Sequence, residues 1–80
     1  MEVQYWHAPV DVTLDGHGHQ RTITATCFAC ECLLTLWPDC HGPAYRAALR
    51  TCVEAMRGEK DQTTARLAFI RAAREAHVLT

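Results

Sequence analysis

The chain has 80 residues, so we expect one domain over residues 1–80 and exclude a second, because a domain usually takes roughly 100 to 200 residues. Hydrophobic residues make up 49% of the sequence and charged residues 21%, which is typical of globular proteins and excludes disordered, collagen-like and coiled-coil chains. The net charge of −1 disfavours general nucleic-acid binding, which usually requires a basic domain.

The N-terminal residues 1–7 contain neither a basic segment nor an apolar segment of the kind found in signal peptides, so we expect a cytoplasmic protein. The longest apolar stretch, residues 32–37, is far shorter than the roughly 18 residues that a membrane-spanning helix requires. The chain has five cysteines, an odd number, which we expect to be free thiols in a reducing compartment.

The first third of the chain predicts a β-hairpin. After Pro9, the residues Val10, Val12 and Leu14 alternate with polar residues, which is the pattern of a half-buried strand. The glycine-containing segment 15–20 predicts a turn, and the β-branched run 21–26 predicts the second strand. Residues 1–8 fit either a short extra strand or a loose N-terminal segment.

The remainder predicts three helices. Thr26 is a suitable N-cap, and apolar residues spaced three, four and seven apart predict a helix to about residue 36, which Pro38 terminates. Pro43 suits the first turn of a second helix that Gly58 ends, and Asp61 suits the cap of a third helix with an alanine-rich apolar face. The order ββααα predicts an α+β domain of two layers, in which the helices cover one face of the hairpin.

Residues spread over the predicted helices also resemble a known family. The combination consists of Trp37-Pro38, Gly42, Tyr45, Ala48, Cys52, Gly58, Ala65-Arg66, Ala68-Phe69-Ile70 and Ala72-Ala73. It resembles the small bacterial proteins called domain of unknown function 982, over residues 9–78. The resemblance implies a small cytoplasmic protein without an established activity or cofactor, so it transfers no functional residue. Cys52 fits the family pattern, whereas the other four cysteines depart from it.

Cys27 and Cys30 have the CxxC spacing of a redox motif and lie at the start of a predicted helix, where the helix dipole stabilises a thiolate. A thioredoxin-type site belongs to a βαβ unit, however, and no later strand is predicted that could be the parallel partner. Cys30 also falls on the apolar face of its helix, as a buried structural thiol would. The sequence therefore favours a structural role over the redox alternative.

A second group of residues is a candidate zinc site. The second strand leads away from the turn that holds His17 and His19, and the first helix must run back across the sheet toward that turn. His17, His19, Cys40 and His41 would then meet at one end of the domain, and thiolate and imidazole are ligands that zinc prefers. The competing interpretation is a solvated turn and loop.

The function classes can be ranked from these observations. Nucleotide binding and catalysis are disfavoured, because no glycine-rich loop opens a helix and no cysteine is shown to lie beside a base. The arginines of the second and third helices are expected to be solvated. We expect a non-enzymatic interaction module that pairs through an exposed hairpin edge with a second copy or another protein, and with neither nucleic acid nor a membrane. The alternative is a metal-binding or thiol-reactive protein, with zinc as the one cofactor considered.

Overall fold

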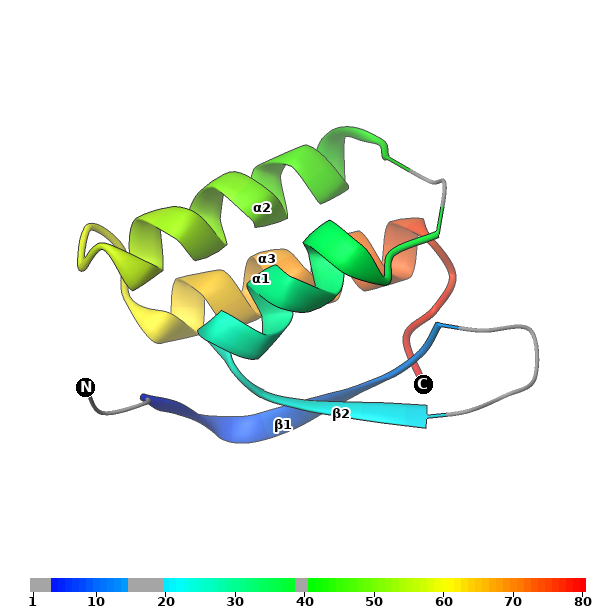
Figure 1. The fold of residues 1–80 in the computed structure, drawn as a ribbon, viewed down its shortest axis with the longest axis horizontal. Coiled ribbons are helices and arrows are strands. Elements are labelled where there is room, and N and C mark those ends of the chain that lie inside the picture. Colours follow the sequence, from blue (N-terminus) through cyan, green and yellow to red (C-terminus); the bar gives the residue numbers. More distant parts are fainter. Residues whose placement is uncertain (1–3, 15–19, 39–40) are drawn as a thin grey trace.

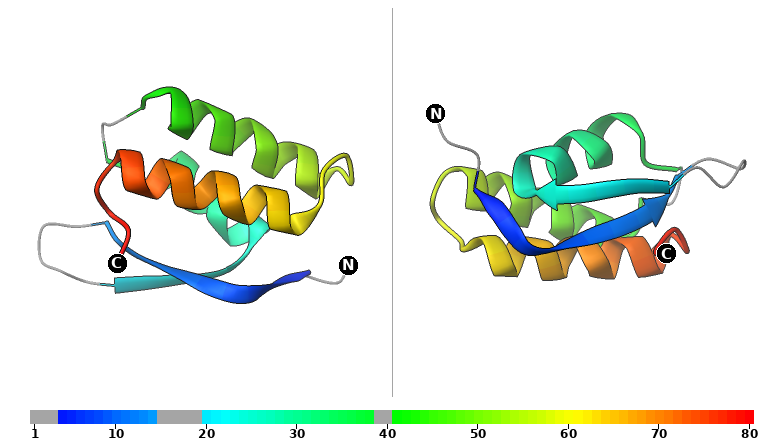
Figure 2. Two further views of the ribbon diagram at one scale, coloured as in Figure 1. Left: turned by 180° about the vertical axis from the view of Figure 1, so that it is seen from behind. Right: turned by 90° about the horizontal axis from the view of Figure 1, so that it is seen from below.

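A computed structural model describes residues 4–14, 20–38 and 41–80. These residues form five elements in the predicted order ββααα: β1 Tyr5–Thr13, β2 Gln20–Ala25, α1 Thr26–Thr35, α2 Pro43–Met56 and α3 Gln62–Glu75. The two strands form an antiparallel sheet, and the helices lie over one of its faces, which confirms the predicted α+β fold (Figure 1). Within the helical layer, α1 and α3 contact the sheet, and α2 packs on both of them farther from it (Figures 1 and 2).

The first strand begins earlier than Pro9. Val10 pairs with Ile23, whereas Tyr5 pairs with Ala25, so the register shifts between Tyr5 and Val10. Pro9 lies in this irregular stretch, where its missing N–H does not interrupt a regular ladder. Residues 5–8 therefore continue β1 and do not form a strand of their own.

The two outer edges of the sheet differ. The N–H of Thr13 donates to the carbonyl of Val78 (2.8 Å), and the N–H of Thr80 donates to the carbonyl of Asp11 (3.0 Å). These bonds cover residues 11–13 at the outer edge of β1, which lies on the α3 side of the sheet (Figure 2, right). β2 forms the opposite edge, on the α1 side, and no segment among residues 4–14, 20–38 and 41–80 pairs with its outer side.

Helix α1 begins without the predicted cap. Its N-cap is Ala25, which has no side-chain acceptor, so the prediction that Thr26 caps the helix is wrong. The Thr26 hydroxyl is instead buried, where it accepts a hydrogen bond from Nε1 of Trp6 (2.9 Å) and donates one to Oε1 of Gln62. Thr26 therefore joins β1, α1 and α3, because tertiary partners occupy the hydroxyl that a local cap would have used.

Helix α2 begins at Pro43 as predicted, and its first turn is capped from another helix. The N–H groups of Ala44 and Tyr45 donate to the two carboxylate oxygens of Glu75, at 3.1 and 3.2 Å. The N-cap residue Gly42 makes this approach possible, because a Cβ atom there would lie 2.6 Å from Oε2 of Glu75. A distant carboxylate thus replaces the local N-cap side chain that Gly42 lacks.

Both long helices end as Schellman motifs, in which a residue with positive φ follows the last turn. Gly58 has φ +82°, as its predicted position after α2 requires, and its N–H donates to Ala55. Helix α3 begins at the predicted cap Asp61, which accepts the N–H of Thr64 (2.7 Å). It ends with His77 in the same position as Gly58, at φ +57°.

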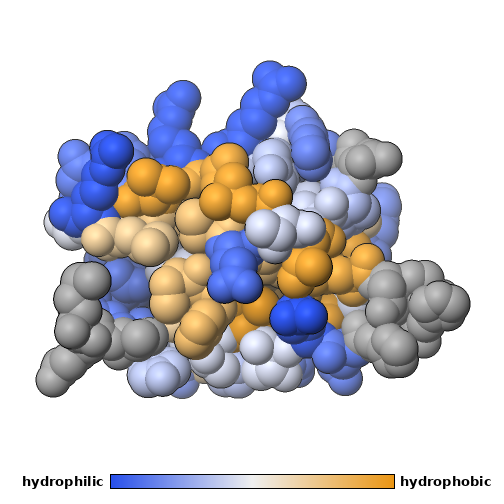
Figure 3. Space-filling model, in the orientation of Figure 1, coloured by the Kyte–Doolittle hydropathy of each residue, from blue (hydrophilic) through white to orange (hydrophobic). Residues whose placement is uncertain are grey.

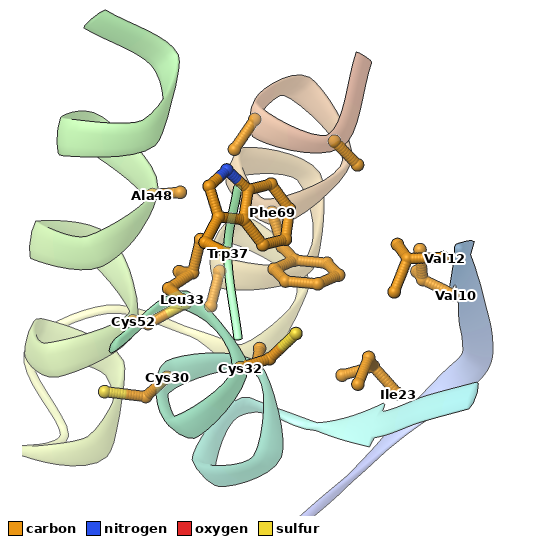
Figure 4. Packing of buried hydrophobic residues seen from close by; sticks show 14 of the residues in the cluster. Val10, Val12, Ile23, Cys30, Cys32, Leu33, Trp37, Ala48, Cys52 and Phe69 are labelled. Atoms are coloured by element: carbon orange, nitrogen blue, oxygen red, sulfur yellow. The ribbon is translucent and has the colours of Figure 1, made fainter. Parts of the chain in front are cut away.

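The core lies between the sheet and the helices and centres on Phe69 of α3, which is completely buried (Figure 4). The rings of Trp6 and Trp37 contact Phe69 with centroid distances of 5.9 and 5.5 Å. Cys52 is buried in the same cluster, and Tyr45 is partly buried against it. No helix in the described part of the chain is long and apolar enough to cross a membrane.

Candidate functional site

Three of the four candidate zinc ligands, His17, His19 and Cys40, lie outside the described residues. His41 is described: it is exposed, and its ring stacks on Tyr45 with a centroid distance of 4.3 Å and an interplanar angle of 10°. Among the residues that the structure describes, no three histidine, cysteine or acidic side chains come together as a metal site would require. The zinc hypothesis therefore remains a prediction.

The redox candidates Cys27 and Cys30 lie in the first half of α1, directly after β2, and both are free thiols. Burial, and to a smaller extent the neighbouring Cys27, raise the pKa of Cys30. Cys30 is buried in the core cluster, as expected for a packing residue. The redox role of the pair remains a prediction.

The two deepest cysteines are packing groups. Burial raises the pKa of Cys32 to about 11 and that of Cys52 to about 12, which keeps both side chains protonated at neutral pH. Both point into the core (Figure 4). Neither thiol is therefore available as a nucleophile or metal ligand in the folded protein.

Backbone groups along the outer edge of β2 have no hydrogen-bond partner among the described residues. The hydrogen bonds of β1 show which residues of β2 carry these groups. Asp11 and Thr13 use a carbonyl and an N–H on the outer side of β1. Because backbone groups in a strand point alternately to either side, Val10 and Val12 direct theirs toward β2.

The same alternation continues across the sheet. Ile23 and Arg21, opposite Val10 and Val12, direct their N–H and C=O groups toward β1. The intervening residues therefore direct theirs to the outside of the sheet, and these are Gln20, Thr22 and Thr24. Three residues of β2 thus form a regular, unpaired row of donors and acceptors.

A shallow groove runs between this open edge and helix α1. Its lining includes Phe28, Glu31 and Leu36 from the helical side and Arg21 and Ile23 from the strand. Phe28 is 42% exposed and Leu36 40% exposed, which is high for large apolar side chains. Apolar side chains gather over α1 and α2 on the face of the molecule toward which the groove opens (Figure 3).

The groove holds one charge of each sign. Arg21 and Glu31 are both exposed and form no ion pair with each other in the described structure. Arg21 lowers the pKa of Cys32 and Glu31 raises it, both by less than burial does. Both charged residues line the groove and are exposed, so both are accessible to an incoming molecule.

The outer face of α2 carries a second, more open groove. Arg46, Arg50 and Arg57 line it together with Glu54 and Glu59. The lining therefore mixes basic and acidic side chains and is not uniformly basic.

Sequence reasoning predicted that an exposed hairpin edge binds a partner, but it did not predict which strand supplies the open edge. It also missed the groove, because Phe28, Glu31 and Leu36 were not singled out. The one signal in the sequence was Phe28 itself, a large apolar residue off the buried stripe of its helix.

Known proteins were compared with this chain by sequence and by structure. No significant match was found among curated proteins or among solved structures. A family model described as "Protein of unknown function (DUF982)" matches residues 8–80, which is nearly the whole chain, and confirms the resemblance of its helical residues. The chain therefore belongs to the DUF982 family of proteins of unknown function.

Proposed function

We propose that this protein is a non-enzymatic interaction module that binds a protein partner by adding a strand to the outer edge of β2, in the bacterial cytoplasm that the family resemblance implies. The asymmetry of the sheet carries the proposal. Residues 78–80 pair with residues 11–13 at the outer edge of β1, whereas along β2 no described segment pairs with the outward N–H and C=O groups of Gln20, Thr22 and Thr24. Such a row is a template for another extended chain.

Three features of β2 support this role. Its six residues contain neither proline nor lysine, the residues that commonly protect an edge strand from pairing. Side chains of an added strand would alternate between the two faces of the sheet, so that one set would face α1. There Phe28 and Leu36 offer exposed apolar surface. Backbone bonds would supply affinity and the groove would supply selectivity.

The proposal can be tested with a substitution at Thr22 that blocks the edge and keeps the backbone ladder of the hairpin; the hydroxyl of Thr22, which donates to Oδ1 of Asp11, is lost in the variant and in its control alike. Thr22→Pro removes one outward N–H, and the ladder to β1 keeps its bonds because the N–H of Thr22 does not point there. Thr22→Val keeps that N–H and is the matched control. Thermal unfolding followed by circular dichroism checks that both variants fold.

The readout is photo-crosslinking in cells of the source organism, from a photoreactive amino acid at Gln20. We expect an adduct with a protein partner in the Thr22→Val background and its loss in the Thr22→Pro background. The same probe at Arg57, which is exposed beyond the end of α2, controls for nonspecific contacts. If no adduct forms at Gln20, or if Thr22→Pro leaves it unchanged, the proposed function is wrong.

A further inference from the structure

We infer that the strand added to β2 is β2 of a second copy, paired antiparallel about a two-fold axis at Thr22, an inference that rests on the proposed function. The backbone selects this register. Gln20, Thr22 and Thr24 are spaced symmetrically about Thr22, so the axis pairs Thr22 with itself and Gln20 with Thr24 of the other copy. Every outward N–H and C=O group of β2 then gains a partner. An axis at Ile23 would leave Gln20 unpaired.

The charges in the groove fit the same axis. Measured from Ala25, Thr22 lies about 10 Å and Arg21 about 13 Å back along β2, at ~3.3 Å per residue. Helix α1 runs back over the strand, and Glu31 lies about 9 Å along it, at ~1.5 Å per residue. Arg21 and Glu31 are therefore both close to the axis. Two copies bring two arginines and two glutamates together, with no net charge.

The apolar residues at the ends of the groove are also complementary under this symmetry. By the same rise per residue, Phe28 lies about 5 Å to one side of Thr22 along the axis of α1, and Leu36 lies about 7 Å to the other side. A two-fold axis therefore places Phe28 of one copy opposite Leu36 of the second. Both side chains are exposed in the single chain, and pairing would remove them from water.

The product would be a continuous four-stranded sheet with the two α1 helices side by side above its centre. Residues 78–80 already pair with residues 11–13 at the outer edge of β1, whereas the outer edge of β2 has no partner among the described residues. Pairing through β2 about a two-fold axis is isologous, so each copy uses this edge once.

Charge reversal tests the inference. Arg21→Glu places four acidic groups at the axis, and Glu31→Arg places four basic groups there. We expect wild-type protein to sediment as a dimer and each variant to dimerise at least about tenfold more weakly, because like charges would meet in the interface. An equimolar mixture of the two variants restores two charges of each sign, so we expect it to recover a heterodimer of wild-type affinity.

Both substituted residues are exposed, and thermal unfolding checks that the variants keep the fold. Arg57→Glu makes the same charge change away from the edge and should leave the sedimentation of the dimer unchanged. The inference would be overturned if the wild type sediments as a monomer at several hundred micromolar or if both charge reversals leave dimerisation unchanged. It would also be overturned if the equimolar mixture forms no heterodimer. If the crosslinked partner at Gln20 is instead a different protein, the second copy is refuted while the edge-binding function stands.

Discussion

Replacement of Glu75 by alanine should destabilise the protein, although local rules for helix α3 predict the reverse. Glu75 lies in the last turn of α3, where a negative charge is unfavourable by roughly 0.3–1 kcal/mol and where alanine is the better helix former. The structure assigns the carboxylate a second task, since it accepts the N–H groups of Ala44 and Tyr45 at the start of α2. Loss of an N-cap costs about 1 kcal/mol, and the carboxylate also loses a favourable charge–dipole contact of ~0.3–1 kcal/mol.

The two dipole contributions nearly cancel, so the net loss should be about 1 kcal/mol, which lowers Tm by roughly 4–8 °C in a domain of this size. Urea and thermal unfolding of Glu75→Ala measure it, with Glu59→Ala as a control that removes an exposed carboxylate. Gly42→Ala should displace the same carboxylate, because its Cβ would lie 2.6 Å from Oε2. The double variant should therefore lose less stability than the sum of the single variants. A stabilised Glu75→Ala protein, or strict additivity, would refute the assignment.

Two further predictions concern the backbone and the core thiols. His77→Gly should raise the free energy of unfolding by about 1 kcal/mol in urea titrations, because His77 has φ +57° and only glycine adopts that conformation without strain; unchanged stability would count against this strain. The pKa of Cys52 is raised from 9.0 to about 12 in the folded protein, so the unfolded state loses the thiol proton at a lower pH than the folded state does. The free energy of unfolding should therefore fall as the pH rises above about 9, by up to ~1.4 kcal/mol per pH unit. Unfolding at pH 8 and pH 10 with reductant should show a smaller decline for Cys52→Ala than for wild type, and equal declines would contradict the assignment.

The candidate site was predictable only in part. The strand patterns in the sequence predict a hairpin, and a sheet of two strands has exposed edges. Which edge stays open depends on residues 78–80, which return to pair with β1 from the far end of the chain. No local sequence pattern predicts this contact, because it consists of backbone hydrogen bonds, and every residue type except proline has both backbone groups.

The helix faces show a similar division. Leu34 belongs to the predicted apolar stripe of α1 but is 62% exposed, whereas Cys32 is almost fully buried. The reason is that α1 contacts both β2 and α2, so its buried face extends around the helix beyond a single stripe. Arg66, predicted to lie outside, is likewise half-buried, and its Nε donates to the carbonyl of Ala8 (2.8 Å). Periodicity identifies a helix, but its neighbours decide which side is covered.

The sequence by itself determined the elements of this protein, because their signals are local. Alternation predicted the first strand and a β-branched run the second, while Pro43 and Asp61 indicated helix starts and Gly58 a helix end. Each signal acts through the conformations or hydrogen bonds of a few adjacent residues. The tertiary structure alone decided that Thr26 bonds to β1 and α3 in place of a cap and that Glu75 caps another helix. These contacts join residues that are 20 to 36 positions apart in sequence, and their partners become neighbours only when the core has formed.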